Sequence, residues 1–275
     1  MDKIDTQEMS NRPIGVFDSG VGGLTVVRAL ERILPREEVI YFGDTARVPY
    51  GIKSAPTIRR FSIENARFLA RFKIKLLIVA CNSSSAFALS ELRKRFDFPV
   101  LGVINPTVEK AVRLARKKIG IIATPATIRS GVYQDSIQRA GRREKRQIEV
   151  FAQECPLFVP LVEEGWLEGK ISRQIAQRYL NKLKNRIEVL ILGCTHYPLL
   201  KKVIRKVIGE KVILIDSATE PARAARDILR KEGLLSSSHK GKTIFYVSDF
   251  PERFKEIGRR FLNKDIEEVR CIRLE

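Results

Sequence analysis

The sequence lacks any apolar run near the roughly 20 residues that a membrane-spanning helix requires. It also lacks a CxxC pair, and its four cysteines lie far apart at Cys81, Cys155, Cys194 and Cys271. That spacing argues against a disulfide framework and against a structural zinc site, so we expect four free thiols. Residues 1–12 form a polar N-terminal extension that resembles neither a secretory signal nor an anchor, and we therefore expect a cytoplasmic protein.

The glycine-rich motifs that bind phosphate are incomplete. Gly20 and Gly22 follow a predicted strand, but the third glycine of a GxGxxG dinucleotide motif would fall on Thr25. Residues 241–243 end like a P-loop, yet position 236 is serine and the run leads into a predicted strand. We interpret residues 241–243 as a turn and expect no nucleotide cofactor.

Acidic residues are scarce relative to basic ones, 32 against 51, which gives a net charge of +19. Such a charge fits a nucleic-acid binder, a protein selected for anionic small molecules, or a thermophile's surface. The bases are spread over stretches such as 108–118 and 222–231 with acids among them, which favours a solvated surface. Only residues 139–146 are locally dense. They lie beside Gly141, where we expect a surface loop, and are the best candidate for a nonspecific phosphate contact.

Short apolar runs alternate with stretches of helical period, which is typical of an α/β fold. We expect strands at 14–17, 39–42, 76–80, 100–103, 119–123, 189–192, 212–215 and 243–247. We expect helices at 24–34, 57–72, 85–96, 108–116, 172–183 and 221–231. The alternation predicts mainly parallel sheets flanked by helices.

Two predicted strand ends resemble each other, namely LIVACNS at residues 77–83 and LILGCTH at 190–196. This suggests two similar α/β domains that face each other, with a crossover at Pro106 and a return after Asp216. The first domain would hold residues 13–105 plus about 217–275, and the second 106–216. Ligands of such sheets bind outside the carboxyl ends of the strands, so we expect the active site in the cleft between the domains.

Cys81 and Cys194 each follow a predicted strand. The N-terminus of a following helix would lower the pKa of each thiol from about 8.5. A single cysteine in such a place would be explained more simply as a buried side chain that fills the core. Two in matching contexts, each followed by hydrogen-bonding groups, favour a function. Paired thiols across a cleft could remove a proton from one face of a carbon and deliver one to the opposite face, which inverts that carbon.

Four ordered motifs resemble those of the glutamate racemases, in the aspartate/glutamate racemase superfamily: GVFDSGVGGLT at 15–25, GDTARVPYG at 43–51, ACNSSSA at 80–86 and LGCTHYP at 192–198. They span nearly the whole chain. The resemblance implies cofactor-independent interconversion of L- and D-glutamate, supplying D-glutamate for peptidoglycan synthesis. It also implies a homodimeric enzyme with no metal, no membrane and no specific nucleic-acid partner.

The resemblance also implies the roles of individual residues. Cys81 and Cys194 would be the two acid/base groups, with Asp18 beside Cys81 and with Glu163 and His196 on the Cys194 side. The residues that would contact substrate are Asp18, Ser19, Tyr50, Gly51, Asn82, Ser83, Thr195 and His196.

Two positions qualify this assignment. Glu164 adjoins Glu163 and competes with it for the same role, and both could instead form an exposed acidic turn. Ser83 stands where the family usually has threonine, so the hydroxyl is kept and a methyl contact is lost. That change bears on substrate fit rather than on the type of reaction.

Alternatives stay open. Another superfamily racemase could act on a different acid, although the DSGVGG and GCTHYP motifs favour glutamate. A noncatalytic binding protein or a basic nucleic-acid-associated protein is disfavoured by the two cysteines and by the lack of a recognisable nucleic-acid motif. Cys194 and His196 could be metal ligands, but a catalytic zinc needs about three protein ligands. We expect His239 at the surface.

Overall fold

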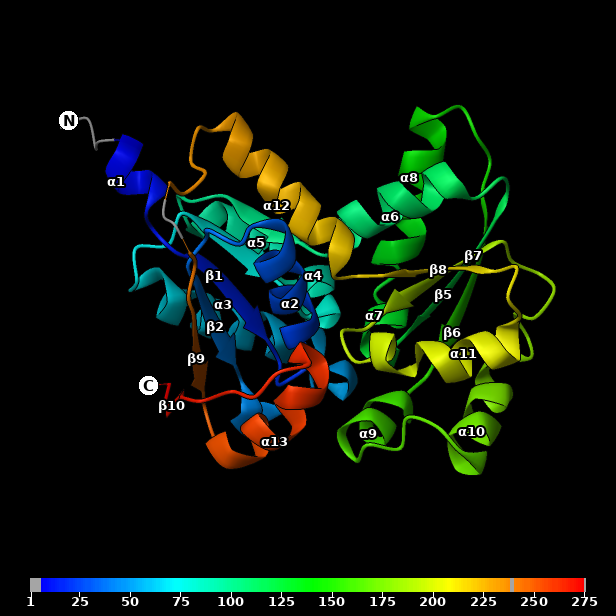
Figure 1. Ribbon diagram of the computed structural model, residues 1–275. Helices are drawn as coiled ribbons and strands as arrows, with labels where there is room; N and C mark the ends of the chain where they lie inside the picture. The colour runs from blue at the N-terminus through cyan, green and yellow to red at the C-terminus, as the bar shows by residue number, and fades with distance from the viewer. Residues whose placement is uncertain (1–5, 238–239, 275) are drawn as a thin grey trace.

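The computed structural model of the protein describes residues 6–237 and 240–274, so His239 and the first five residues of the predicted extension lie outside it. The chain forms two sheets (Figure 1). One has six strands in the order β10-β9-β2-β1-β3-β4, and the other has four in the order β6-β5-β7-β8. All strand pairs within the described residues are parallel. The prediction of parallel sheets flanked by helices is confirmed.

Buried apolar runs form the central strands, because helices cover both faces of each sheet. The six-stranded sheet holds β1 (Ile14–Asp18), β2 (Val39–Gly43), β3 (Leu76–Val79), β4 (Val100–Gly102), β9 (Thr243–Val247) and β10 (Val269–Cys271). The four-stranded sheet holds β5 (Lys118–Ala123), β6 (Glu149–Glu154), β7 (Val189–Gly193) and β8 (Ile213–Asp216).

The helices of the six-stranded sheet lie in two layers. On one face lie α2 (Leu24–Ile33), α12 (Thr219–Lys231) and α13 (Pro251–Leu262), packed with inward side chains such as Ile78. On the other lie α3 (Ala55–Ala70) and α5 (Leu89–Arg95), packed with side chains such as Leu77, and α4 (Asn82–Phe87) packs against α3. The short helix α1 (Thr6–Ser10) precedes β1.

The four-stranded sheet is covered in the same way. On one face, α6 (Ile104–Leu114) and α8 (Val132–Arg143) bury Val108 and Ile137 against Ile191. On the other, α10 (Lys170–Leu180) and α11 (Lys201–Ile208) share a core with Leu190 and Leu192. Two short helices, α7 (Pro125–Arg129) and α9 (Phe158–Glu163), follow the ends of β5 and β6, and three 3₁₀ turns, η1 (Thr45–Arg47), η2 (Tyr50–Ile52) and η3 (Tyr197–Leu200), complete the order.

The structure differs from the sequence-based expectation in several elements. Strands β6 and β10 and helices α7, α8, α9, α11 and α13 were not predicted. The helix expected at 85–96 begins earlier, at Asn82, and is divided at Ala88. The surface loop expected beside Gly141 follows α8 at residues 144–148, whereas Gly141 itself is buried in the last turn of that helix. A Cβ there would lie 2.8 Å from the carbonyl oxygen of Arg146, so the glycine permits a close approach of the returning chain.

Residues 14–102 and 243–271 supply the six-stranded sheet, and residues 118–216 supply the four-stranded one. Pro106 lies in the first turn of α6, where proline is tolerated, and α6 leads into the second half. The residue boundaries of the two domains stay a prediction. No helix in the described ranges combines the length and apolar character needed to cross a bilayer.

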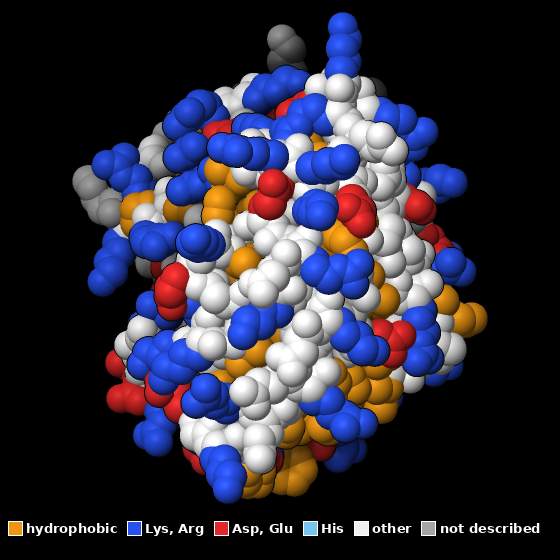
Figure 2. Space-filling model, turned by 90° about the vertical axis from the view of Figure 1, so that its right-hand side faces the viewer, with side chains coloured by type: hydrophobic (Ala, Val, Ile, Leu, Met, Phe, Trp, Pro, Cys, Tyr) orange, Lys and Arg blue, Asp and Glu red, His pale blue; other side chains and the backbone are white. Residues whose placement is uncertain are grey.

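Lys and Arg side chains are spread over the face of the molecule shown in Figure 2, with Asp and Glu side chains among them. Many of the charges are paired at the surface, for example Arg129 with Glu154 and Lys202 with Glu168. Exposed pairs of this kind contribute little to stability, about 0–1 kcal/mol each.

Candidate active site

The carboxyl ends of strands from both sheets meet at one narrow cleft. Asp18 ends β1, Cys81 lies between β3 and α4, and Cys194 follows β7 directly. Of the eleven predicted site residues all but Asp18 line this cleft, which is bounded by Ser19, Gly20, Val48, Pro49, Tyr50, Gly51, Cys81, Asn82, Ser83, Thr124, Val159, Glu163, Gly193, Cys194, Thr195 and His196. Its cavity volume is about 30 Å³, far below the roughly 300–1,000 Å³ of typical small-molecule sites.

Cys81 lies on the side of the cleft that the six-stranded sheet provides. It is 6% exposed and is the N-cap residue of α4. Burial and then the nearby Asp18 carboxylate raise the pKa of its thiol to about 12, while hydrogen bonds from Ser84 and Ser19 act in the opposite direction. The expectation of a lowered pKa at Cys81 is therefore wrong. The helix N-terminus does favour the thiolate, but the loss of solvent outweighs it.

Asp18 lies behind the cleft wall, fully buried. Its Oδ1 accepts a hydrogen bond from the Gly20 N–H at 3.1 Å, and its Oδ2 accepts one from the Thr195 hydroxyl at 3.5 Å. Burial raises the pKa of Asp18, although His196 and the neighbouring backbone N–H groups lower it in part. The carboxyl group thus contacts the Cys194 motif while it also acts electrostatically on Cys81.

The first glycine-rich motif packs directly on the Cys194 motif. A Cβ atom at Gly22 would lie 2.3 Å from Oγ1 of Thr195 and 2.5 Å from Nδ1 of His196. The Thr25 hydroxyl donates to the carbonyl oxygen of Thr195 at 3.3 Å. Glycine at position 22 therefore allows the backbone to approach the imidazole, which explains the motif without a phosphate ligand.

On the Cys194 side, three side chains form a chain of contacts. Cys194 Sγ lies 3.9 Å from Nδ1 of His196, and Nε2 of the same ring lies 2.9 Å from Oε1 of Glu163. Burial lowers the pKa of His196, but Cys194 and Glu163 outweigh this and raise it to about 10. The structure places Glu163 against His196, whereas Glu164 is exposed and pairs with Arg253 at 3.0 Å.

The residues that follow Cys81 connect the two halves of the molecule. Asn82 Nδ2 donates to the Ser217 hydroxyl at 3.0 Å, and the Tyr133 hydroxyl donates to Asn82 Oδ1 at 2.7 Å. The Ser83 hydroxyl lies 2.9 Å from Thr127 Oγ1 and 3.3 Å from Thr124 Oγ1.

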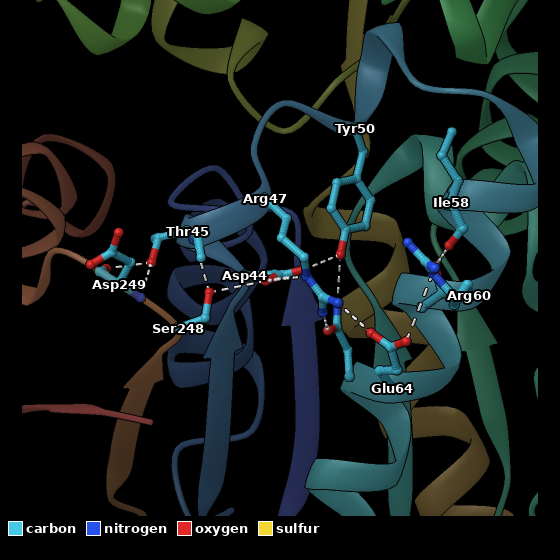
Figure 3. A network of polar contacts seen from close by, with 12 residues as sticks. Asp44, Thr45, Arg47, Tyr50, Ile58, Arg60, Glu64, Ser248 and Asp249 are labelled. Atoms are coloured by element: carbon cyan, nitrogen blue, oxygen red, sulfur yellow. Dashed lines mark hydrogen bonds and ion pairs between the residues drawn. The ribbon is translucent and has the colours of Figure 1, made fainter. Parts of the chain in front are cut away.

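Tyr50 and Gly51 lie in η2 at the rim of the cleft, and a polar network holds this turn (Figure 3). The buried Tyr50 hydroxyl donates to the Asp44 carboxylate and accepts from Asn65 Nδ2 at 3.1 Å. The Asp44 carboxylate also accepts hydrogen bonds from Arg47 Nε at 2.7 Å and from the Ser248 hydroxyl at 2.9 Å. The turn is thereby tied to α3 and to the end of β9.

Sequence reasoning missed several residues of the cleft and its support. Thr124 follows a predicted strand, so the rule about strand ends would have found it. The Asp44 network and Val159 carry no such signal, because their place depends on tertiary contacts. Within the described ranges, no group of three or more His, Cys, Asp or Glu side chains is arranged to hold a metal ion.

Each half of the molecule thus brings one cysteine to a shared cleft. The sequence matches the Asp/Glu/Hydantoin racemase family over residues 14–225, and the chain belongs to this family. It is an amino-acid racemase.

Its relatives narrow the class further. The glutamate racemase of Geobacter metallireducens is 48% identical over 267 residues, which cover 96% of this chain and 97% of the relative. The glutamate racemase of Francisella tularensis, solved in complex with D-glutamate, is 40% identical with a TM-score of 0.90, covering 97% of this chain and 99% of that one. The Thermus thermophilus glutamate racemase, solved with β-chloro-D-alanine, is 44% identical with a TM-score of 0.87, covering 96% and 98%.

Proposed function

We propose that this racemase interconverts L- and D-glutamate by two-base transfer of the α-proton, with Cys81 and Cys194 as the acid/base pair. The observation that carries the proposal is the placement of these two thiols, which follow strands of different sheets and line one cleft. The glutamate specificity is supported by relatives that are glutamate racemases over nearly the whole chain.

The surroundings of the two thiols support a direction for the first step. A protonated His196, held by Glu163, stabilises a thiolate on Cys194. That thiolate removes the α-proton of L-glutamate, and the electron pair of the broken bond stays on the substrate. Cys81 keeps its proton because of its raised pKa and delivers it to the opposite face. The D-to-L direction uses the same groups in reverse, with Asp18 assisting Cys81.

The other cleft residues supply hydrogen-bond partners for the two carboxylates and the ammonium group of glutamate. Ser19, Asn82, Ser83 and Thr195 would hold the carboxylates and the amino group so that the α-carbon lies between the thiols, together with Asp18, Tyr50, Gly51 and His196. The cavity of about 30 Å³ is far smaller than glutamate. We therefore expect the two halves to separate when substrate enters.

The proposal includes a biological setting. A cytoplasmic glutamate racemase without cofactor or metal would supply D-glutamate for peptidoglycan synthesis and cell-wall biogenesis. We also propose a homodimer, with the domain limits given above.

An interconversion assay tests the proposed activity. Protein that has been dialysed exhaustively against a chelator should convert either enantiomer of glutamate to the racemic mixture, measured by chiral chromatography, with no added pyridoxal phosphate, nucleotide or metal. Aspartate serves as the matched substrate, shorter by one methylene. Loss of activity that returns with one cofactor, or faster turnover of aspartate, would contradict the proposal.

A further inference from the structure

Helix α13 belongs to the layer on the six-stranded sheet, yet its C-terminal half contacts the proton-transfer groups of the other half. Its buried Phe254 and Ile257 share a core with Leu24 of α2. In Figure 1, α13 (red) lies beside α9 (green) at the lower side of the molecule, across the boundary between the two halves. Three side chains of α13, namely Arg253, Arg260 and Phe261, cross this boundary.

Arg260 holds the end of α9, the short helix whose last residue is Glu163. Its NH1 group donates to the Glu163 carbonyl oxygen at 2.9 Å. This satisfies one of the carbonyl groups that every helix leaves without a partner at its C-terminus. Gly165 has a positive φ of 76°, and a Cβ there would lie 3.1 Å from the Arg260 guanidinium carbon. The guanidinium thus fits over a turn that has no side chain.

Phe261 holds the ring to which Glu163 is bonded. The ring centroids of His196 and Phe261 are 5.4 Å apart, with an angle of 86° between the planes. Phe261 is fully buried, so this edge-to-face contact fixes one side of the imidazole. The two ring nitrogens of His196 contact Cys194 and Glu163. A third contact, between Arg253 and Glu164, is exposed at both partners and is expected to add little.

From these contacts we infer that Arg260 is a positioning residue for the Glu163–His196 pair, and that α13 makes the reactivity of Cys194 depend on the other half of the molecule. The inference rests on the proposed two-cysteine mechanism. Cys81 is supported instead by Asp18 and Ser19 of its own half. Loss of the Arg260 contact should therefore impair one of the two proton transfers and spare the other.

Racemisation rates cannot reveal such a one-sided defect. L- and D-glutamate have equal free energies in solution, so kcat/KM must be the same in both directions whatever the variant. A half-reaction is needed. With a glutamate analogue that carries a leaving group on the β-carbon, one thiolate removes the α-proton, the leaving group departs with its bonding electrons, and an α,β double bond forms. Only one cysteine is used.

The experiment combines Arg260 variants with single cysteine variants. In Cys81→Ser, elimination from the L-analogue reports on Cys194, and in Cys194→Ser, elimination from the D-analogue reports on Cys81. Adding Arg260→Ala to Cys81→Ser should slow elimination from the L-analogue by roughly tenfold or more, in line with the loss of a charge-assisted hydrogen bond. Adding it to Cys194→Ser should change elimination from the D-analogue by less than about twofold. Arg260→Lys keeps a charged donor and should recover part of the loss.

The matched control is Arg259→Ala, which removes the same charge from the same helix at an exposed position. Arg259→Ala should leave the rate of each elimination within about twofold of the rate in the corresponding single cysteine variant. Equal losses in both backgrounds on Arg260→Ala, or no loss in either, would overturn the positioning role. Failure of the two-cysteine mechanism itself would show separately, because Cys81→Ser without any change at Arg260 would then still racemise glutamate.

Discussion

Nε2 of His196 lies 2.9 Å from Oε1 of Glu163, and Nδ1 of the same ring lies 3.9 Å from the sulfur of Cys194. The imidazole therefore connects a carboxylate to a thiol inside the protein. Among the described residues, Cys81 has no equivalent imidazole beside it. Burial and the nearby Asp18 carboxylate instead raise the pKa of its thiol. The two thiols occupy matching places in the two halves but differ in their electrostatic surroundings.

The first prediction concerns the charge of His196. Its pKa is raised from about 6.5 to about 10, so the ring should stay protonated at pH 8. The chain has two histidines, so ¹⁵N-histidine NMR with a His239→Gln variant assigns the signal. Because the folded pKa is the higher one, the stabilisation it brings should be complete below about pH 6.5 and lost as pH rises towards 10. A midpoint near 6.5 would refute this.

The second prediction concerns the cysteines. Cys81→Ser and Cys194→Ser should each abolish racemisation, because serine keeps the size but is far too weak a base. Cys81→Ser should retain elimination only from the L-form of an analogue with a leaving group, and Cys194→Ser only from the D-form. Cys155→Ser is the control, since Cys155 is buried outside the cleft. Near wild-type racemisation by both variants would rule out the mechanism.

The third prediction concerns Ser83, which lies 2.9 Å from Thr127 Oγ1. Ser83→Ala should raise KM for glutamate by roughly tenfold, since it removes a buried hydroxyl from the cleft and leaves Thr127 with one partner fewer. Ser83→Thr keeps the hydroxyl and serves as the control, with KM expected within about threefold of the parent. Steady-state kinetics measure both. An unchanged KM in the alanine variant would remove Ser83 from the proposed substrate contacts.

The fourth prediction concerns the network of Figure 3. Tyr50→Phe removes a donor from the buried Asp44 carboxylate and should lower the free energy of unfolding by about 1–3 kcal/mol, measured by urea denaturation. Tyr246→Phe is the control. Its hydroxyl accepts from Arg270, an exposed group that water can serve instead, so we expect a change within about 0.5 kcal/mol. Equal effects of the two substitutions would contradict the role given to the network.

The fifth prediction concerns the net charge of +19. It should attract the glutamate anion, so kcat/KM should fall as salt shortens the screening length to about 8 Å at physiological ionic strength. Measuring kcat/KM across a salt series, with a neutral polyol as viscosity control, tests this. A flat profile together with tight binding of duplex DNA would show that the charge serves another purpose.

The sequence predicted the strands that are buried throughout and missed two strands at sheet edges, β6 and β10. Strand β1 is buried throughout and reads as an apolar run. Strand β6, Glu149–Glu154, lies at a sheet edge with exposed and half-buried residues, so its run is broken by polar side chains. Helix α8 was missed for a related reason, since its buried stripe is narrow among many charged residues.

For the site, the matching strand ends predicted Cys81 and Cys194 in one cleft, because each cysteine follows a strand at the carboxyl edge of its own sheet and the two edges face each other across the cleft. The same rule could not reveal Arg260, which lies on a helix and reaches Glu163 across 97 residues of chain. Nor could it anticipate the raised pKa of Cys81, because that follows from how completely the two halves exclude water.

Cys271 is exposed in the last strand, whereas the other three cysteines are buried and all four are free. A thiol reagent added to the native protein should thus label Cys271 at once and reach Cys81 and Cys194 only while the cleft stands open. In a Cys271→Ser background, the rate of the slow modification measures how often the cleft opens, without any substrate turnover. Bound glutamate should slow this modification further, because it would lie between the two thiols and block the reagent.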